Sequence, residues 1–193
     1  MSNFLPWIVR AVRRRVGEWI ENLHDRFSGL PRMPVVDPIY RVLFVCYGNL
    51  CRSPMAEGIL RSKLAAAGLL ERVLVDSAGI SDVNRGRAPD WRARASARRR
   101  GVLIGEHRAR QLQQEDFERF DAILTMDESN RAAALQAAPD ANAAAKVRLA
   151  DDSGREVPDP AFGTQGDFER IYDLLDVLTD RLMHVIRALV GKP

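Results

Sequence analysis

The stretch over residues 42–54, VLFVCYGNLCRSP, constrains the fold of this chain more than any other. Its first four residues are β-branched, aliphatic or aromatic, as in a short strand that is buried on both faces. Ser53 and Pro54 are typical of the N-cap and the first residue of a helix. We therefore expect a buried strand, a loop over residues 46–52 and then a helix. Unpaired backbone N–H groups at the start of such a helix attract an anion.

From residue 41 onward, short apolar runs alternate with helical patterns. This alternation predicts an α/β fold with a mainly parallel sheet that is covered by helices on both faces. We predict strands over residues 41–45, 73–77, 122–126 and 146–149. We predict helices over residues 54–67, 90–100, 128–136 and 167–190. Two biased patches predict solvated helix surface, one Ala-rich over residues 132–145 and one Arg-rich over residues 85–100.

Residues 1–39 have a different pattern from the rest of the chain. Apolar side chains recur at three- and four-residue intervals over residues 5–27, which predicts an amphipathic helix, and a Pro-rich linker follows. We therefore divide the chain into residues 1–39 and one domain over residues 40–193. The apolar face of residues 5–27 needs a surface to cover it. The following domain or a second subunit, an anionic membrane surface, and another protein all stay open as that surface.

Composition excludes several classes of protein. The chain has 193 residues and no apolar run of about 18 residues, which argues against a membrane-spanning helix. A net charge of +3 gives little support for binding to nucleic acid. Only two cysteines occur, which excludes a disulfide scaffold and favours a reducing, cytoplasmic location. The arginines at positions 10 and 13–15 interrupt any secretory signal, and the Ala- and Arg-rich composition hints at a bacterial source.

The loop over residues 46–52 carries the chemistry. Backbone amides, a helix N-terminus and the Arg52 guanidinium each favour a thiolate at Cys46, so we expect a nucleophile at neutral pH. The Arg52 fork matches two oxygens of a phosphate group. Ser53 lies across the loop from Cys46 and can donate a hydrogen bond to the thiolate. The residues that we expect to wrap the phosphate between them are Tyr47, Gly48, Asn49, Leu50 and Cys51.

Phosphoryl transfer to a thiolate also needs an acid that protonates the leaving group. Asp159 is the best candidate, in the stretch VPDPAFG over residues 157–163. Prolines at 158 and 160 stiffen this loop, and Pro160 disfavours helical backbone at Asp159. An Asp-Pro pair by itself indicates an Asx-turn. Beside the cysteine loop, a general acid is the better interpretation.

With these residues the chain resembles the low-molecular-weight protein tyrosine phosphatase family. The resemblance covers about residues 41–190 and rests on the Cys-x5-Arg loop together with further stretches in matching order and spacing. These are VDSAG (75–79), ARQ (109–111), DF (116–117), MDESN (126–130), DP (159–160) and DFE (167–169). The resemblance implies a four-stranded parallel sheet flanked by helices. It also implies hydrolysis of phosphotyrosine in protein substrates through a cysteinyl-phosphate.

The resemblance assigns roles to single residues. The nucleophile, the phosphate ligand and the general acid fall on Cys46, Arg52 and Asp159. The resemblance further implies that Asn49 is hydrogen-bonded to Ser77 and His107 and holds the loop in shape. Asp127 is then part of the scaffold behind the loop.

The chain also departs from the family at the rim of the pocket. The family usually carries one or two aromatic residues just after the Asp-Pro; here Ala161 takes the first such place and Phe162 the second, and Val83 lies in the variable loop. We therefore expect the wall that grips phosphotyrosine to be reshaped. Tyr47 and Trp91 can replace part of that stacking surface. Leu50 is aliphatic where the related arginine phosphatases carry threonine, and this favours phosphotyrosine.

Other functions stay open at this point. An arsenate reductase of the same fold needs further cysteines downstream, and none follows Cys51, so it would have to use an external thiol. A phosphate-binding module without catalysis is the other alternative. A metal site is not favoured, because no second ligand pair joins Cys46 and Cys51 at a suitable spacing. We expect no metal and no cofactor.

Overall fold

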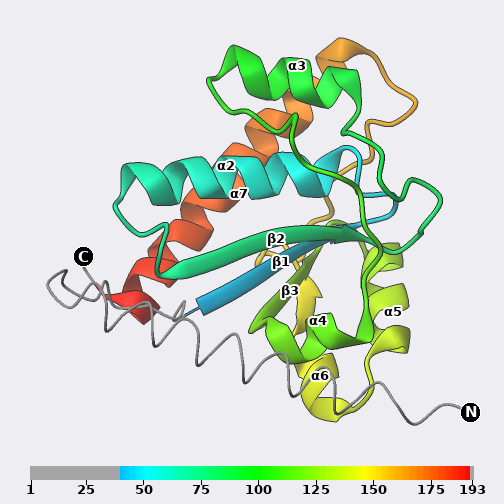
Figure 1. The fold of residues 1–193 in the computed structure, drawn as a ribbon, viewed down its shortest axis with the longest axis vertical. Helices are drawn as coiled ribbons and strands as arrows, with labels where there is room; N and C mark the ends of the chain where they lie inside the picture. The colour runs from blue at the N-terminus through cyan, green and yellow to red at the C-terminus, as the bar shows by residue number, and fades with distance from the viewer. Residues whose placement is uncertain (1–39, 192–193) are drawn as a thin grey trace, which may run out of the picture. The chain divides into compact units, whose positions relative to one another are not determined.

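The computed structural model describes residues 40–191. The predicted helix over residues 5–27 and the boundary after residue 39 lie outside this range. Four strands form one parallel sheet in the order β2-β1-β3-β4 (Figure 1). The strands are β1 (Tyr40–Cys46), β2 (Val73–Gly79), β3 (Ala122–Thr125) and β4 (Val147–Leu149). The helices are α2 (Arg52–Ala66), α3 (Trp91–Arg99), α4 (Gln114–Arg119), α5 (Glu128–Ala137), α6 (Ala141–Ala145) and α7 (Gln165–Val190).

The sheet is buried on both faces, as the near-continuous apolar strands predict. Val42 and Phe44 of β1 point to one face and belong to a core that α2, α3 and α7 complete. Leu43 and Val45 point to the other face and pack with apolar residues of α4, α5 and α6. The two groups of helices lie on opposite sides of the sheet (Figure 1). The predicted four-stranded α/β architecture is therefore confirmed.

The four predicted strands and the four predicted helices all occur, with shifted ends. Helix α7 begins at Gln165, two residues earlier than predicted, because Thr164 and Asp167 form a capping box. Two short helices, α4 and α6, were not predicted. Each has only five or six residues, too few to show an apolar period. The Arg-rich patch is helical only from Trp91 onward, and residues 85–90 form turns and irregular chain.

The start of α2 corrects the sequence interpretation of Ser53. The helix begins at Arg52, its N-cap is Cys51, and no side chain caps it. Ser53 and Pro54 are therefore the second and third helical residues, and the loop spans residues 46–51. The hydroxyl of Ser53 is used for contacts inside the site instead of a cap. None of the helices within residues 40–191 is long and apolar enough to cross a membrane.

Candidate active site

The phosphate loop, defined here as residues 46–52, leaves the sheet where the strand order changes direction. Strand β1 has β2 on one side and β3 on the other, so the chain moves across the sheet in one direction from β1 to β2 and in the other direction from β2 to β3. Such a switch point opens a crevice at the carboxyl ends of parallel strands. Cys46 is the last residue of β1 and is 3% exposed. The thiol therefore lies at the floor of this crevice, at the N-terminal end of α2.

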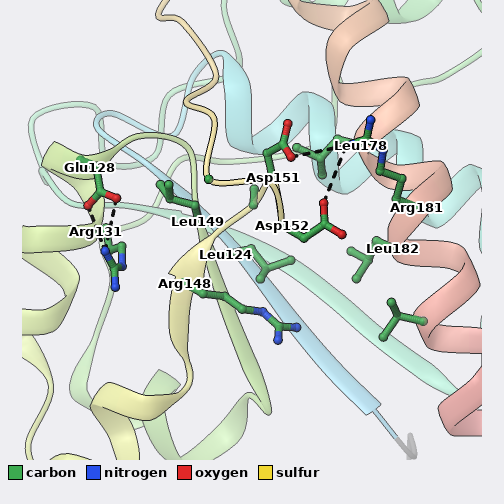
Figure 2. A pocket seen from close by; sticks show the side chains of 13 residues that line it. Leu124, Glu128, Arg131, Arg148, Leu149, Asp151, Asp152, Leu178, Arg181 and Leu182 are labelled. Carbon is green, nitrogen blue, oxygen red and sulfur yellow. Dashed lines mark hydrogen bonds and ion pairs between the residues drawn. The ribbon is translucent and has the colours of Figure 1, made fainter.

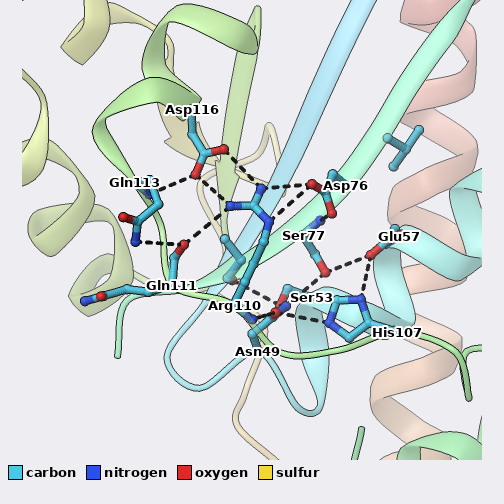
Figure 3. A network of polar contacts seen from close by, with 12 residues as sticks. Asn49, Ser53, Glu57, Asp76, Ser77, His107, Arg110, Gln111, Gln113 and Asp116 are labelled. Carbon is cyan, nitrogen blue, oxygen red and sulfur yellow. Dashed lines mark hydrogen bonds and ion pairs between the residues drawn. The ribbon is translucent and has the colours of Figure 1, made fainter. Parts of the chain in front are cut away.

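Asn49 is the centre of the loop (Figure 3). Its φ of 53° is in the left-handed region, and its side chain is fully buried. Its Nδ2 donates to Ser53 Oγ and to Ser77 Oγ, both at 2.9 Å. Its Oδ1 accepts from the backbone N–H of Arg110 at 2.9 Å and lies 3.1 Å from His107 Nε2. Four partners thus hold a backbone conformation that few residues other than glycine adopt.

These bonds also involve two hydroxyl groups. Ser77 accepts from Asn49 and donates to Glu57 Oε2 at 2.8 Å. Ser53 accepts from Asn49, and its single hydrogen has two acceptors within reach, Cys46 Sγ at 3.0 Å and the carbonyl of Ala78 at 3.4 Å. A serine that donates to this sulfur stabilises the thiolate. The contact between Ser53 and Cys46 that the sequence predicted is present.

A second layer of charged groups supports this network. Glu57 Oε2 also lies 3.3 Å from His107 Nδ1. Arg110 donates to both carboxylates beside it, Asp76 at 2.9 Å and Asp116 at 2.8 Å. Burial alone would lower the pKa of Arg110, but the two carboxylates outweigh it and raise this pKa above its ordinary value. Arg110 therefore stays charged while its backbone N–H fixes Asn49.

Gly79, at the end of β2, lets the loop approach the sheet. A Cβ at this position would lie 2.9 Å from the carbonyl oxygen of Tyr47 and 3.1 Å from the backbone nitrogen of Asn49. Both are backbone atoms that cannot move aside cheaply. Any larger residue at 79 would push the phosphate loop away from the strand.

Arg52 joins the phosphate loop to two carboxylates and is 2% exposed. Its Nη1 donates to Asp127 Oδ2 at 2.5 Å and to the carbonyl of Val157 at 2.9 Å. Its Nη2 donates to Asp159 Oδ2 at 2.7 Å. Its Nε is buried and has no hydrogen-bond partner within residues 40–191. One donor of a buried guanidinium is therefore left for a ligand.

The surroundings keep Arg52 charged. Burial alone would lower the pKa of Arg52, but the charge of Cys46, the hydrogen bond to Asp127 and the charge of Asp159 together raise it above its ordinary value. A permanent cation thus lies beside the buried sulfur of Cys46.

Asp159 lies at the open side of the crevice. Its side chain is 44% exposed, and its Oδ1 accepts from the backbone N–H of Ala161 at 3.1 Å. The Asx-turn contact and the ion pair with Arg52 are thus made by different oxygens of one carboxylate. The structure brings the loop, the guanidinium and the predicted acid together, although Asp159 is 107 residues away from Arg52 in sequence.

A sequence profile that describes the low-molecular-weight phosphotyrosine protein phosphatases matches residues 41–191. The chain belongs to this family. A phosphatase of this class from Streptomyces coelicolor is 37% identical over 158 residues, which are 78% of this chain and 96% of that protein. The pig phosphatase is 40% identical over 136 residues, 68% of this chain and 85% of that protein.

A solved structure has a similar fold. Wzb from Vibrio vulnificus in complex with benzylphosphonate superposes with a TM-score of 0.68 at 28% identity. The match covers 76% of this chain and 98% of Wzb. The present chain is therefore an enzyme of the low-molecular-weight protein tyrosine phosphatase class.

The rim of this phosphatase carries exposed aromatic side chains. Tyr47, in the loop, and Trp91, at the start of α3, are 57% and 64% exposed. Phe162 is fully exposed, and Val83 is exposed as well. Leu50 is half-buried and packs against the core. Exposed aromatic side chains thus occur on the phosphate loop, on α3 and on the loop after Asp159.

Cys51 differs from Cys46. It is buried, and burial raises the pKa of its thiol well above the ordinary value, with the charges of Cys46, Asp90 and Asp159 adding to the effect. The thiol of Cys51 therefore stays protonated. Its side chain packs in the apolar core beneath the loop.

A separate cavity of about 520 Å³ lies between β4, α5 and α7 (Figure 2). Leucines line it, and most of its charged groups are paired, Arg131 with Glu128 and Arg181 with Asp151 and Asp152. No residue that the sequence assigned to the site lines it. The cavity is not part of the phosphatase site.

Sequence reasoning missed several residues of the site. Nothing in the sequence indicated the carbonyl of Val157, the backbone N–H of Arg110 or the carboxylate of Glu57. Backbone groups occur at every residue, and a single charged side chain forms no recognisable sequence motif. Gly79 could have been found, since a glycine that ends a buried strand indicates a close backbone approach.

Proposed function

We propose that this phosphatase hydrolyses phosphotyrosine in protein substrates through a cysteinyl-phosphate on Cys46. The observation that carries the proposal is the buried Cys46 thiol beside Arg52, together with the ion pair between Arg52 and Asp159. A thiol nucleophile, a phosphate ligand and an acid are the three groups that this reaction needs.

In the first step the Cys46 thiolate attacks phosphorus, and the bond from phosphorus to the phenolic oxygen breaks. The loop amides and Arg52 bind the three phosphate oxygens that do not leave, and they stabilise the charge of the transition state. Asp159 gives its proton to the leaving oxygen, so that a neutral tyrosine departs.

A bound phosphate also releases the acid. In the free enzyme Arg52 donates to Asp159. A phosphate dianion competes for the same guanidinium. Once Arg52 has turned its donors to the phosphate, Asp159 is free to face the leaving oxygen.

In the second step water attacks the phosphorus of the cysteinyl-phosphate. The Asp159 carboxylate now accepts a proton from this water, and the bond between sulfur and phosphorus breaks. Ser53 donates to the leaving sulfur, as its 3.0 Å contact with Cys46 allows. Inorganic phosphate leaves, and the thiolate is restored.

Three features support an aromatic phosphomonoester as the substrate. The ring of Tyr47 is exposed on the phosphate loop, and the ring of Trp91 is exposed next to Asp90, whose N–H donates to the Leu50 carbonyl. Leu50 itself is aliphatic and half-buried. The structural relative Wzb was solved with benzylphosphonate, a compound that joins a ring to a phosphonate. A phosphotyrosine side chain has the same two parts.

One experiment tests this proposal against arsenate reduction and against phosphate binding without catalysis. Turnover of a phosphotyrosine peptide, of p-nitrophenyl phosphate and of arsenate with glutathione is measured side by side for the wild-type enzyme and Cys46→Ser. We expect turnover of both phosphomonoesters and none of arsenate, and Cys46→Ser abolishes activity while it still binds phosphate, because its hydroxyl stays protonated. Arsenate turnover, or substantial activity of Cys46→Ser, would overturn the proposal.

A further inference from the structure

Arg92 connects α3 to the loop that carries the proposed acid. We call this segment, residues 158–164, the acid loop. Arg92 Nη1 donates to the carbonyl of Gly163 at 2.6 Å, and Nη2 donates to the carbonyl of Ala161 at 2.9 Å. These two carbonyls belong to residues two and four positions after Asp159. One guanidinium therefore spans the acid loop immediately beyond the acid.

The side chain of Arg92 is itself fixed from two sides. Asp90 accepts from Arg92 Nε at 3.0 Å and from Nη2 at 2.8 Å, and the guanidinium lies 4.4 Å from the centre of the Phe168 ring. The hydrogen bonds with Asp90 raise the pKa of Arg92 above its ordinary value, so the fork stays charged. A planar, stacked and doubly hydrogen-bonded arginine has little freedom to move.

Asp90 extends this connection to the phosphate loop. Its backbone N–H donates to the carbonyl of Leu50 at 2.9 Å, and its carboxylate caps α3 by accepting from the Arg92 N–H at 2.8 Å. The pair Asp90–Arg92 thus touches the backbone of the phosphate loop at one end and the backbone of the acid loop at the other. It bridges the two loops without touching Cys46, Arg52 or Asp159.

This bridge matters most when a substrate is bound. In the free enzyme the acid loop is also tied to the site by the ion pair between Arg52 and Asp159. We expect a bound phosphate to compete for the Arg52 donors and to weaken that ion pair. The bonds from Arg92 to the Ala161 and Gly163 carbonyls do not compete with phosphate, so they remain.

We propose that Arg92, held by Asp90, is a positioning residue that keeps the acid loop in register with the phosphate loop during proton transfer by Asp159. This inference rests on the proposed function, because it assigns a role relative to the acid. An acid displaced by about 1 Å loses much of its efficiency, since proton transfer needs hydrogen-bond distance to the leaving oxygen. Arg92 thereby affects most strongly the rate of substrates whose leaving group needs the acid.

Arg100 offers a matched control. It is the C-cap residue of α3, it pairs with carboxylates of α7 (Glu169 and Asp173), and its guanidinium lies 4.5 Å from the centre of the Tyr172 ring. Both arginines join α3 to α7. Arg92 does so through its contact with the Phe168 ring, and Arg100 does so through its ion pairs and its contact with the Tyr172 ring. Unlike Arg92, Arg100 makes no hydrogen bond or ion pair with the acid loop, residues 158–164. The Arg100→Ala variant therefore measures how the rate changes when α3 is held less tightly on α7 and the contacts from Arg92 to the acid loop are kept.

The experiment compares Arg92→Ala, Arg92→Lys and Arg100→Ala on two substrates. Phenyl phosphate has a poor leaving group that needs the acid, and p-nitrophenyl phosphate has a good one that hardly does. For Arg92→Ala we expect kcat on phenyl phosphate to fall about tenfold or more, and on p-nitrophenyl phosphate by less than about threefold. Arg92→Lys restores part of the loss, and Arg100→Ala lowers both rates equally or not at all.

A double variant decides whether Arg92 acts through the acid. In an Asp159→Ala background, Arg92→Ala should cause no further loss on phenyl phosphate, because no acid is left to position. Equal losses on both substrates, an additive loss in the double variant, or the same selective loss in Arg100→Ala would overturn the inference. If Arg92→Ala does not fold, as judged by circular dichroism, the same comparison is made with Arg92→Lys. A wild-type enzyme inactive on both substrates would overturn the proposed function itself, which separates the two failures.

Discussion

The phosphate loop and the acid loop carry the two halves of the proposed chemistry, but they are held in different ways. In the phosphate loop, the buried side chain of Asn49 makes four contacts, and the chain lies against Gly79 with no space for a methyl group. In the acid loop, Phe162 is fully exposed, and the contacts that tie the loop to the domain include those from Arg52 and Arg92.

This difference matches what each loop does. A loop that binds a dianion and stabilises its transition state works best when its donors are already in place before the substrate arrives. An acid has to take up a proton, give it away and let the product leave, so its loop needs a contact that substrate binding can release. The shared residue is Arg52, which belongs to the first loop and holds the second.

Of the substitutions below, Arg52→Lys should lower kcat the most, because Arg52 contacts both loops. A lysine can replace the charge but not the fork, so contacts to phosphate, Asp127 and Asp159 cannot all be kept. We expect kcat to fall by about 10³-fold or more on any phosphomonoester. The measurement is steady-state turnover of p-nitrophenyl phosphate, with a melting curve to establish folding. Near-normal activity would mean that a point charge is enough.

Asp159→Ala removes the acid and leaves the phosphate loop intact. We expect a loss of about 10²- to 10⁴-fold on phenyl phosphate and a much smaller loss on p-nitrophenyl phosphate. Rates for a series of leaving groups of increasing basicity give the measurement. Equal losses on every substrate would place the acid elsewhere, with Asp127, the other carboxylate that accepts from Arg52, as the next residue to test.

Gly79→Ala disturbs the position of the phosphate loop by adding a methyl group on the adjacent strand, and it changes no polar group. The added methyl group would meet the backbone of Tyr47 and Asn49 at 2.9 and 3.1 Å, so the loop has to shift. We expect about tenfold weaker binding of inorganic phosphate, as competitive inhibitor, and a loss of about 1–3 kcal/mol in the free energy of unfolding. Gly105→Ala is the control, since its Cβ would meet nothing within 4 Å. The same phosphate affinity in both variants would contradict this account.

Glu169→Gln tests the helix pair that supports the acid loop. Burial alone would raise the pKa of Glu169, but hydrogen bonds from Arg100, Ser96 and Gln165 outweigh it and lower the pKa from 4.5 to about 2. A lowered folded-state pKa means stability that is present above about pH 4.5 and is lost as the pH falls toward 2.

We therefore expect the wild-type free energy of unfolding to fall between pH 5 and pH 2 by about 1–2 kcal/mol more than that of Glu169→Gln. Urea denaturation at a series of pH values gives the measurement. Parallel pH profiles for the two proteins would show that this carboxylate does not couple α3 to α7.

The sequence predicted the phosphate loop well because its signals are local. A buried strand, a thiol, two residues that tolerate left-handed backbone, an arginine and a helix start lie within 13 consecutive positions, residues 42–54. The order of these residues alone places amides and a guanidinium around Cys46. The one local error was the predicted helix start at residue 54, where the structure has Arg52. It arose because the Ser53 hydroxyl turns toward Cys46 and Asn49 instead of capping the helix.

What holds the loops was decided only by the tertiary structure. Asn49 is fixed by Ser77, His107 and Arg110, which lie 28, 58 and 61 residues away. The family resemblance implied the first two, and no pattern in the chain pointed to the third. The bonds from Arg92 to the acid loop span 69 and 71 residues and end on backbone carbonyls. Every residue has a carbonyl, so the partner of such a bond depends on how the helices pack and not on residue type.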